Sequence, residues 1–208
     1  MASEARKRSI GKRKAQLTVV AAGGHLTRHA SLHSLPERMI EDAIRREDWP
    51  AARRLIRAAL RRKPDSHWLL TRLGLTYYEE RDYERSLVYS NQAFQLAPRC
   101  PLVLWDLAGT YEMLGRLTEA HRLYRHLVSR GIPTISSGPC GEGVARARGL
   151  VADCWYRIAH IELSRGRRNL ADASFHRHLA LRGPGCRSIY SISKVRRELR
   201  AASLTTSK

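Results

Sequence analysis

The chain has 208 residues, 43% of them hydrophobic and 27% charged, which is ordinary for one soluble globular domain with a sizeable core. No apolar run approaches the roughly 20 residues that a membrane-spanning helix needs, so we expect no membrane contact. The formal net charge is +19, with +6 in residues 1–32 and +5 in residues 186–208, whereas residues 67–134 are close to neutral. Four cysteines without a CxxC pair predict reduced thiols in a cytoplasmic protein.

The first 32 residues lack helical periodicity. Basic residues, several glycines and scattered Ser and Thr predict a basic flexible N-terminal arm there. A helix is then predicted to begin after Ser34, because Ser is a good N-cap and Pro36 and Glu37 follow in the first turn. Residues 33–66 are therefore expected to form two helices, at about 36–47 and 50–62.

The strongest pattern is a repeat with a period of 34 residues, which gives repeats at 67–100 and 101–134 and, shifted back once, at 33–66. The corresponding pairs are Leu70 and Leu104, Leu73 and Leu107, Gly74 and Ala108, and Tyr77 and Tyr111. A small residue at a fixed position allows two helices to cross closely, which predicts a helical hairpin in each repeat. Pro98 and Pro133 are predicted to end the second helices.

The repeat resumes only after a break. Residues 152–185 fit a fourth repeat, which leaves residues 135–151 as an insertion of 17 residues. The insertion is predicted to begin as a loop and then to become helical, so that one long helix covers about 143–164. In residues 186–208, Ser191 is predicted to cap an end helix that closes the array and leads into a basic tail.

The chain resembles the tetratricopeptide-repeat family over about residues 33–185. It also looks like a group of small bacterial repeat proteins with Leu-Ala-Pro-Arg-Cys-Pro at 96–101, Cys-Gly-Glu-Gly at 140–143 and Asp-Cys at 153–154. The resemblance implies an all-α, right-handed superhelical solenoid of about four hairpins plus a C-terminal capping helix. It also implies a concave side, lined by the first helix of each hairpin, that binds a protein or peptide segment. The resemblance does not imply catalysis.

The resemblance places certain positions of each first helix on the binding side. The aromatic, apolar and Arg residues that we assign to a protein-binding groove are Trp68, Arg72, Leu75, Tyr78, Trp105, Tyr156 and Arg157. Glu79 and Asp106 occupy further positions of the same set. Aromatic and Arg side chains are frequent anchors of protein interfaces. The alternative is that Trp68 and Trp105 simply pack between helices.

No Asn or Lys stands at the groove positions, which argues against the clamp for a C-terminal carboxylate found in some family members. No Cys or His pair has the short spacing of structural zinc, and Cys140 is far from Cys154, so we expect no metal and no cofactor. A nucleophile elbow, a phosphate loop and a zinc-protease motif are all missing from the sequence. We therefore expect a protein that is not an enzyme, with no catalytic residue and no small-molecule substrate.

Two functional classes stay open. The first is a scaffold that binds a protein segment in its groove. The second is a basic adaptor that contacts nucleic acid or a ribonucleoprotein through its termini, weakly and without sequence preference. An Arg-rich surface that only keeps the protein soluble is the simpler explanation of the terminal charge.

Overall fold

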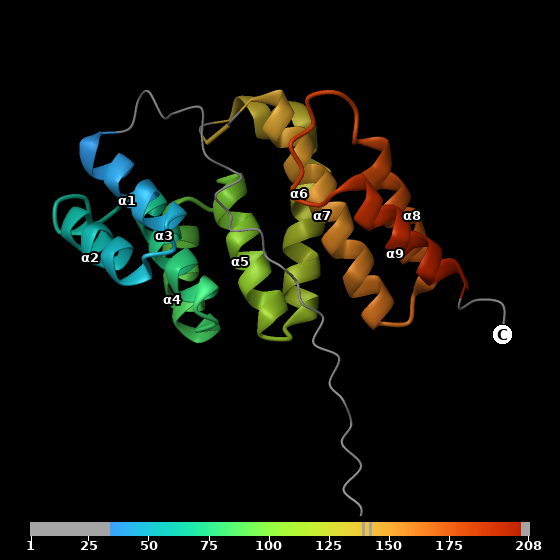
Figure 1. Cartoon of the computed structure of the whole chain (residues 1–208), viewed down its shortest axis with the longest axis horizontal. Helices are drawn as coiled ribbons and strands as arrows, with labels where there is room; N and C mark the ends of the chain where they lie inside the picture. The colour runs from blue at the N-terminus through green and yellow to red at the C-terminus, as the bar shows by residue number, and fades with distance from the viewer. Residues whose placement is uncertain (1–33, 139, 142, 205–208) are drawn as a thin grey trace, which may run out of the picture.

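The computed structural model describes residues 34–138, 140–141 and 143–204, so the predicted basic arm at 1–32 lies outside the described residues. Within the described part the regular structure is entirely helical (Figure 1). The helices are α1 (Leu35–Arg45), α2 (Trp49–Leu60), α3 (His67–Glu79), α4 (Tyr83–Leu96), α5 (Pro101–Met113), α6 (Leu117–Ser137), α7 (Val144–Ser164), α8 (Arg168–Ala180) and α9 (Ile192–Leu204). Among the described residues, no helix is both long and apolar enough to cross a membrane.

The helices form a row of hairpins. Each helix packs against the next one along the chain, and α3 also contacts α5, so that the hairpins α1–α2, α3–α4, α5–α6 and α7–α8 stack in order (Figure 1). Helix α9 packs on α8 at the end of the row. The prediction of an all-α solenoid of four hairpins with an end helix is confirmed.

The turn inside each hairpin has a common geometry. Glu47, Arg81, Gly115 and Gly166 each adopt a positive φ, between 56° and 75°, immediately after a first helix. The first three are spaced by the 34-residue period. A left-handed residue ends one helix and turns the chain so that the second helix can fold back.

Most predicted helix starts and ends agree with the structure. Ser34 forms a capping box with Glu37, and α4 ends before Pro98. Helix α7 begins within one residue of the predicted position, and the Lys194 amide donates to Ser191 Oγ (3.2 Å), which caps α9.

The prediction that Pro133 ends a helix is wrong, because α6 continues to Ser137. The interruption comes earlier, at Gly131, where φ is 73° and ψ is 160°. After this kink Pro133 lies in a new helical turn, where its missing amide hydrogen is not needed. The insertion consequently begins with helix, and the loop predicted to start it is confined to the residues after Ser137.

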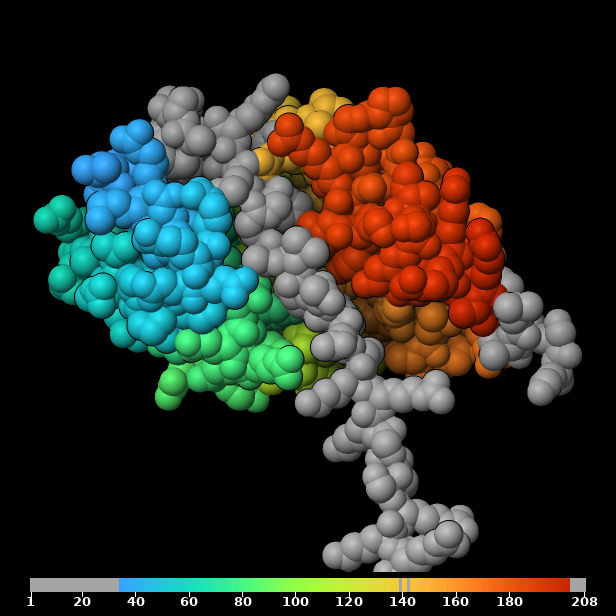
Figure 2. All heavy atoms as spheres, in the orientation of Figure 1, coloured from blue at the N-terminus to red at the C-terminus, as the bar shows by residue number. Residues whose placement is uncertain are grey.

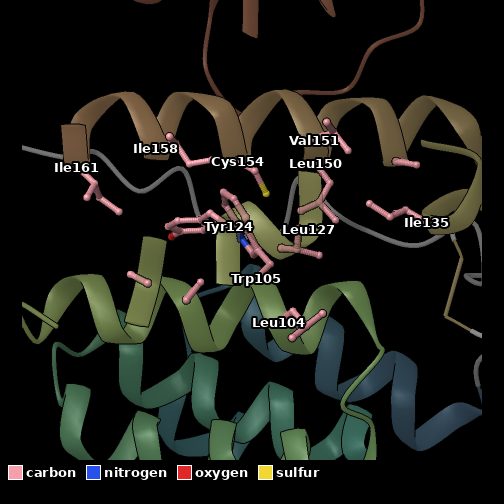
Figure 3. Close-up of a cluster of buried hydrophobic side chains, with 13 residues drawn as sticks. Leu104, Trp105, Tyr124, Leu127, Ile135, Leu150, Val151, Cys154, Ile158 and Ile161 are labelled. Carbon is pink, nitrogen blue, oxygen red and sulfur yellow. The ribbon is translucent and has the colours of Figure 1, made fainter. Parts of the chain in front are cut away.

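The two extra turns at the start of α7 cover the kinked end of α6. Leu150 and Val151 of α7 belong to the same buried cluster as Leu127 and Ile135 of α6 (Figure 3). The cluster continues to Trp105 of α5. The insertion therefore extends the core rather than standing away from it.

Candidate protein-binding surface

The seven groove residues predicted from the sequence come from three successive first helices. Helix α3 supplies Trp68, Arg72, Leu75 and Tyr78, α5 supplies Trp105, and α7 supplies Tyr156 and Arg157. Figure 2 shows α1–α2 at one end of this row and α9 at the other.

Five of the seven side chains are buried, namely those of Arg72, Leu75, Trp105, Tyr156 and Arg157. The Trp105 ring packs in the core, 5.4 Å from the Tyr124 ring, which is the arrangement that the packing alternative expects (Figure 3). Trp68 and Tyr78 are half-buried and keep exposed surface. The groove role of the whole set stays a prediction.

A buried ion pair joins the first two repeats. Arg72 Nε donates to Glu41 Oε1 at 2.6 Å, and both side chains are 9% exposed. The Arg72 guanidinium also lies over the Trp68 ring, 5.4 Å from its centre. The pairing keeps a positive charge in place on this face at an acceptable desolvation cost.

A second polar network joins the third and fourth repeats. Arg157 pairs with Glu112 at 3.1 Å, and the Tyr124 hydroxyl donates to Glu112 at 3.0 Å. Tyr78 adjoins this network, and burial raises its pKa to about 12, while the nearby Arg157 charge acts in the opposite direction. A side chain at Gly109 would lie 3.9 Å from the Tyr78 hydroxyl, so Tyr78 of α3 reaches across to α5.

The last first helix is tied to α9. Tyr156 stacks on Tyr190 with 3.7 Å between ring centres, and Lys194 lies over both rings. His160 Nε2 lies 3.0 Å from a Glu198 oxygen. These contacts explain why Tyr156 is buried although it occupies a groove position.

Two acidic groove residues are not neutralised in this way. Desolvation raises the pKa of Asp106 from 3.8 to about 7, although the Arg72 charge opposes this shift. Desolvation, followed by the charge of Glu47, raises the pKa of Glu79 from 4.5 to about 7. Arg72, the basic residue that acts on Asp106, is already paired with Glu41. Among the described residues, Glu79 Oε1 is buried without a hydrogen-bond partner.

The comparisons with known proteins agree with this architecture. A family model for the tetratricopeptide repeat matches residues 69–100. Two solved structures have the same fold: MamA, with 14% identity over 82% of this chain and 80% of that one (TM-score 0.61), and the protein TTC0263 of Thermus thermophilus, described as a thermophilic TPR protein, with 16% identity over 81% of both chains (TM-score 0.57). A search of curated proteins found no match.

Residues 69–100 therefore match the tetratricopeptide-repeat family, and the described residues share the fold of solved tetratricopeptide-repeat proteins. The tetratricopeptide-repeat fold in general serves as a protein-interaction scaffold.

The tetratricopeptide pattern predicted which helices line the candidate surface, but the acidic character of that surface was not predicted. Glu79 and Asp106 were visible at groove positions, whereas their lack of a paired cation within the described residues depends on contacts between residues far apart in the chain. The structure also brings together His67, Cys100 and Cys140, whose sequence spacing gave no sign of a cluster. Cys154 does not belong to this group and is buried in the core.

Proposed function

We propose that this chain is a non-enzymatic scaffold whose first-helix face binds a protein or peptide segment carrying Lys or Arg. The proposal rests mainly on the half-buried carboxyls of Asp106 and Glu79, which form no ion pair with any described residue, and on the buried Glu79 Oε1, which has no hydrogen-bond partner there. A charged hydrogen bond from a basic side chain would offset their desolvation. The half-buried rings of Trp68 and Tyr78 on the same face offer contact area for the rest of the segment.

The positive net charge of the protein restricts where a basic segment can bind. The protein carries +19 overall, so a basic segment is repelled by most of the molecule and attracted only where acidic groups gather. The surface contains four acidic side chains: Glu41, Glu79, Asp106 and Glu112. Arg72 pairs with Glu41 and Arg157 pairs with Glu112, so the excess of acidic groups comes from Glu79 and Asp106.

The test uses peptides that share one apolar sequence and differ only in carrying Lys, Gln or Glu at a single position. We expect the Lys peptide to bind most tightly by calorimetry. Asp106→Asn and Glu79→Gln should each weaken its binding by about 10-fold, which corresponds to the loss of one charged hydrogen bond. Asp42→Asn, at an exposed carboxyl of α1, is the matched control. Equal affinities for the three peptides would contradict the proposal.

The pH dependence provides a second readout. The two carboxyls are largely protonated below their pKa of about 7, so affinity for the Lys peptide should rise between about pH 6 and pH 8. The rise should be smaller in Asp106→Asn. Trp68→Ala and Tyr78→Ala should weaken binding in the folded protein, whereas Trp105→Ala should destabilise the fold by about 3–5 kcal/mol.

Nucleic-acid binding is the second candidate, and an arginine-rich face supports it. One shallow pocket is lined by Arg53, Arg54 and Arg57 of α2 and by Arg61, which follows this helix. Counterion release would make such binding weak and steeply salt-dependent. Binding of RNA or DNA at about 50 mM salt that is reduced by removing residues 1–32 or by Arg54→Ala would support this candidate, and no binding at that salt would exclude it.

A further inference from the structure

Three potential metal ligands lie close together at one edge of the row of hairpins, where α3 and α5 begin. His67 is the first residue of α3, Cys100 is the N-cap of α5, and Cys140 lies in the turn between α6 and α7. Their ligand atoms all lie within 4.8 Å of one another, and His67 Nε2 is 3.5 Å from Cys140 Sγ. The three residues come from three separate parts of the chain, so the fold has to assemble the group.

The distances suit a tetrahedral ion. Zinc binds sulfur at about 2.3 Å and imidazole nitrogen at about 2.0–2.1 Å, which puts neighbouring ligand atoms roughly 3.5–3.8 Å apart. The imidazole–thiol separation already has this value. The remaining separations need to shorten by about 1 Å at most to close around the ion.

The backbone holds the two cysteines in place. Pro101 follows Cys100 directly and begins α5, and the Cys100 amide donates to the Ala97 carbonyl at 3.0 Å. Cys140 precedes Gly141, whose amide donates to the Gly138 carbonyl at 2.7 Å. A side chain at Gly141 would lie 2.3 Å from the Ser136 carbonyl oxygen, so this tight turn requires glycine. The positive ends of α3 and α5 also favour thiolate ligands.

Two of the three ligands keep exposed surface, so solvent can supply a fourth ligand. Cys100 is 5% exposed, while Cys140 and His67 are half-buried. A pocket of about 20 Å³ borders Cys140, and that volume can hold one water molecule. Two thiolates and one imidazole form a ligand set that selects zinc-like ions over magnesium or calcium.

We propose that His67, Cys100 and Cys140 bind one Zn²⁺ ion, with water as the fourth ligand. The ion links the turn before α7 to the N-terminal ends of α3 and α5. It would therefore fasten the insertion to the repeat edge and couple zinc binding to stability.

The test begins with reduced, metal-free protein titrated with Zn²⁺ against a chromophoric chelator, and with Co²⁺ as a spectroscopic probe. We expect one ion per chain, a thiolate-to-cobalt charge-transfer band, and visible bands of tetrahedral intensity. Cys100→Ser, Cys140→Ser and His67→Gln should each weaken zinc binding by at least about 100-fold, since even outer ligands are worth 10–100-fold. Ser keeps the N-cap at position 100, so this variant should stay folded.

Matched controls change the same residue types outside the cluster. Cys186→Ser and His126→Gln should bind zinc like the wild type. A readout that needs no variant is alkylation, because zinc should slow the reaction of Cys140 and leave that of Cys186 unchanged. Zinc affinity unaltered by the three ligand variants would overturn the proposal. A Cys100–Cys140 disulfide in protein whose reduced form does not bind zinc would overturn it as well.

Discussion

The hairpin turns show how a single residue can carry a conformational cost. Arg81 is exposed and adopts a φ of 65°, whereas Gly115 and Gly166 fill the equivalent place with glycine. A left-handed conformation costs a residue with a Cβ roughly 1 kcal/mol or more, and glycine avoids this cost.

We therefore predict that Arg81→Gly stabilises the protein by about 0.5–1 kcal/mol, even though most glycine substitutions destabilise. Chemical denaturation followed by circular dichroism measures the change. Gln92→Gly, at an exposed position inside α4, is the control and should cost about 1 kcal/mol. A loss of stability in Arg81→Gly would show that the arginine side chain stabilises the turn by more than the backbone strain costs.

Asp153 is a buried carboxyl that should make stability depend on pH. The Ser188 hydroxyl and the Ile189 amide donate to its two oxygens. Desolvation nevertheless raises its pKa from 3.8 to about 7. The unfolded chain releases the carboxyl proton near pH 4, whereas the folded protein keeps it up to about pH 7.

Stability should accordingly fall as the pH rises through this window and level off above about pH 7. We predict that the stability of Asp153→Asn relative to the wild type increases by up to about 3 kcal/mol when the pH is raised from about 5 to about 8. Urea denaturation at both pH values tests this. Asp65→Asn, at an exposed carboxyl, controls for the loss of one negative charge. A constant difference between wild type and Asp153→Asn would contradict the assignment.

At the scale of elements, α7 is bound closely to the segment that leads to α9. A Cβ at Gly149 would lie 1.8 Å from the Arg187 carbonyl oxygen, so only glycine permits this approach. The Arg187 amide donates to the Ala145 carbonyl at 3.3 Å across the same contact. The segment then places Tyr190 on the Tyr156 ring.

We predict that Gly149→Ala destabilises the protein by about 1–3 kcal/mol, because backbone has to move to admit one methyl group. Gly109→Ala is the matched control, since it also lies in a helix but would meet only ordinary contacts at 3.8 Å or more. That variant should be neutral or stabilised by up to about 1 kcal/mol. Thermal unfolding of the two variants side by side gives the comparison, and equal effects would argue against the close contact.

Helix positions could be predicted from the sequence because they depend on local signals and on the 34-residue period. Ser34, Pro98 and Ser191 act within one or two turns of their own positions, and each behaved as predicted. The kink at Gly131 was missed because Gly131 and Pro133 together resemble a stop signal. The ion pair of Glu41 with Arg72 was missed because it joins residues 31 positions apart.

The sequence carries a weak signal for the approach of His67 to Cys100. The two residues are 33 positions apart, one short of the period, which places them at the same end of neighbouring hairpins. Cys140 lies in the insertion, where the period no longer applies, so its approach to them could be found only in three dimensions.

At the scale of the whole molecule, a solenoid is stabilised mainly by contacts between neighbouring repeats. The α1–α2 hairpin packs on one neighbour through α3, whereas α7–α8 has α6 on one side and α9 on the other. Local opening should therefore be easier at the first hairpin. The buried Glu41–Arg72 pair is one of the contacts that hold it to α3.

We predict that amides of α1 and α2 exchange with deuterium faster than those of α7, and that Glu41→Gln widens the difference. The substitution removes the carboxylate that pairs with the buried Arg72, and breaking an ion pair costs about 3–5 kcal/mol when it is fully buried. Exchange in α1 and α2 should rise by at least about 10-fold, while exchange in α7 stays unchanged. Asp42→Asn on the same helix, where the carboxyl is exposed, should have no such effect. A uniform rise from α1 to α8 would instead show that the repeats open together as one cooperative unit.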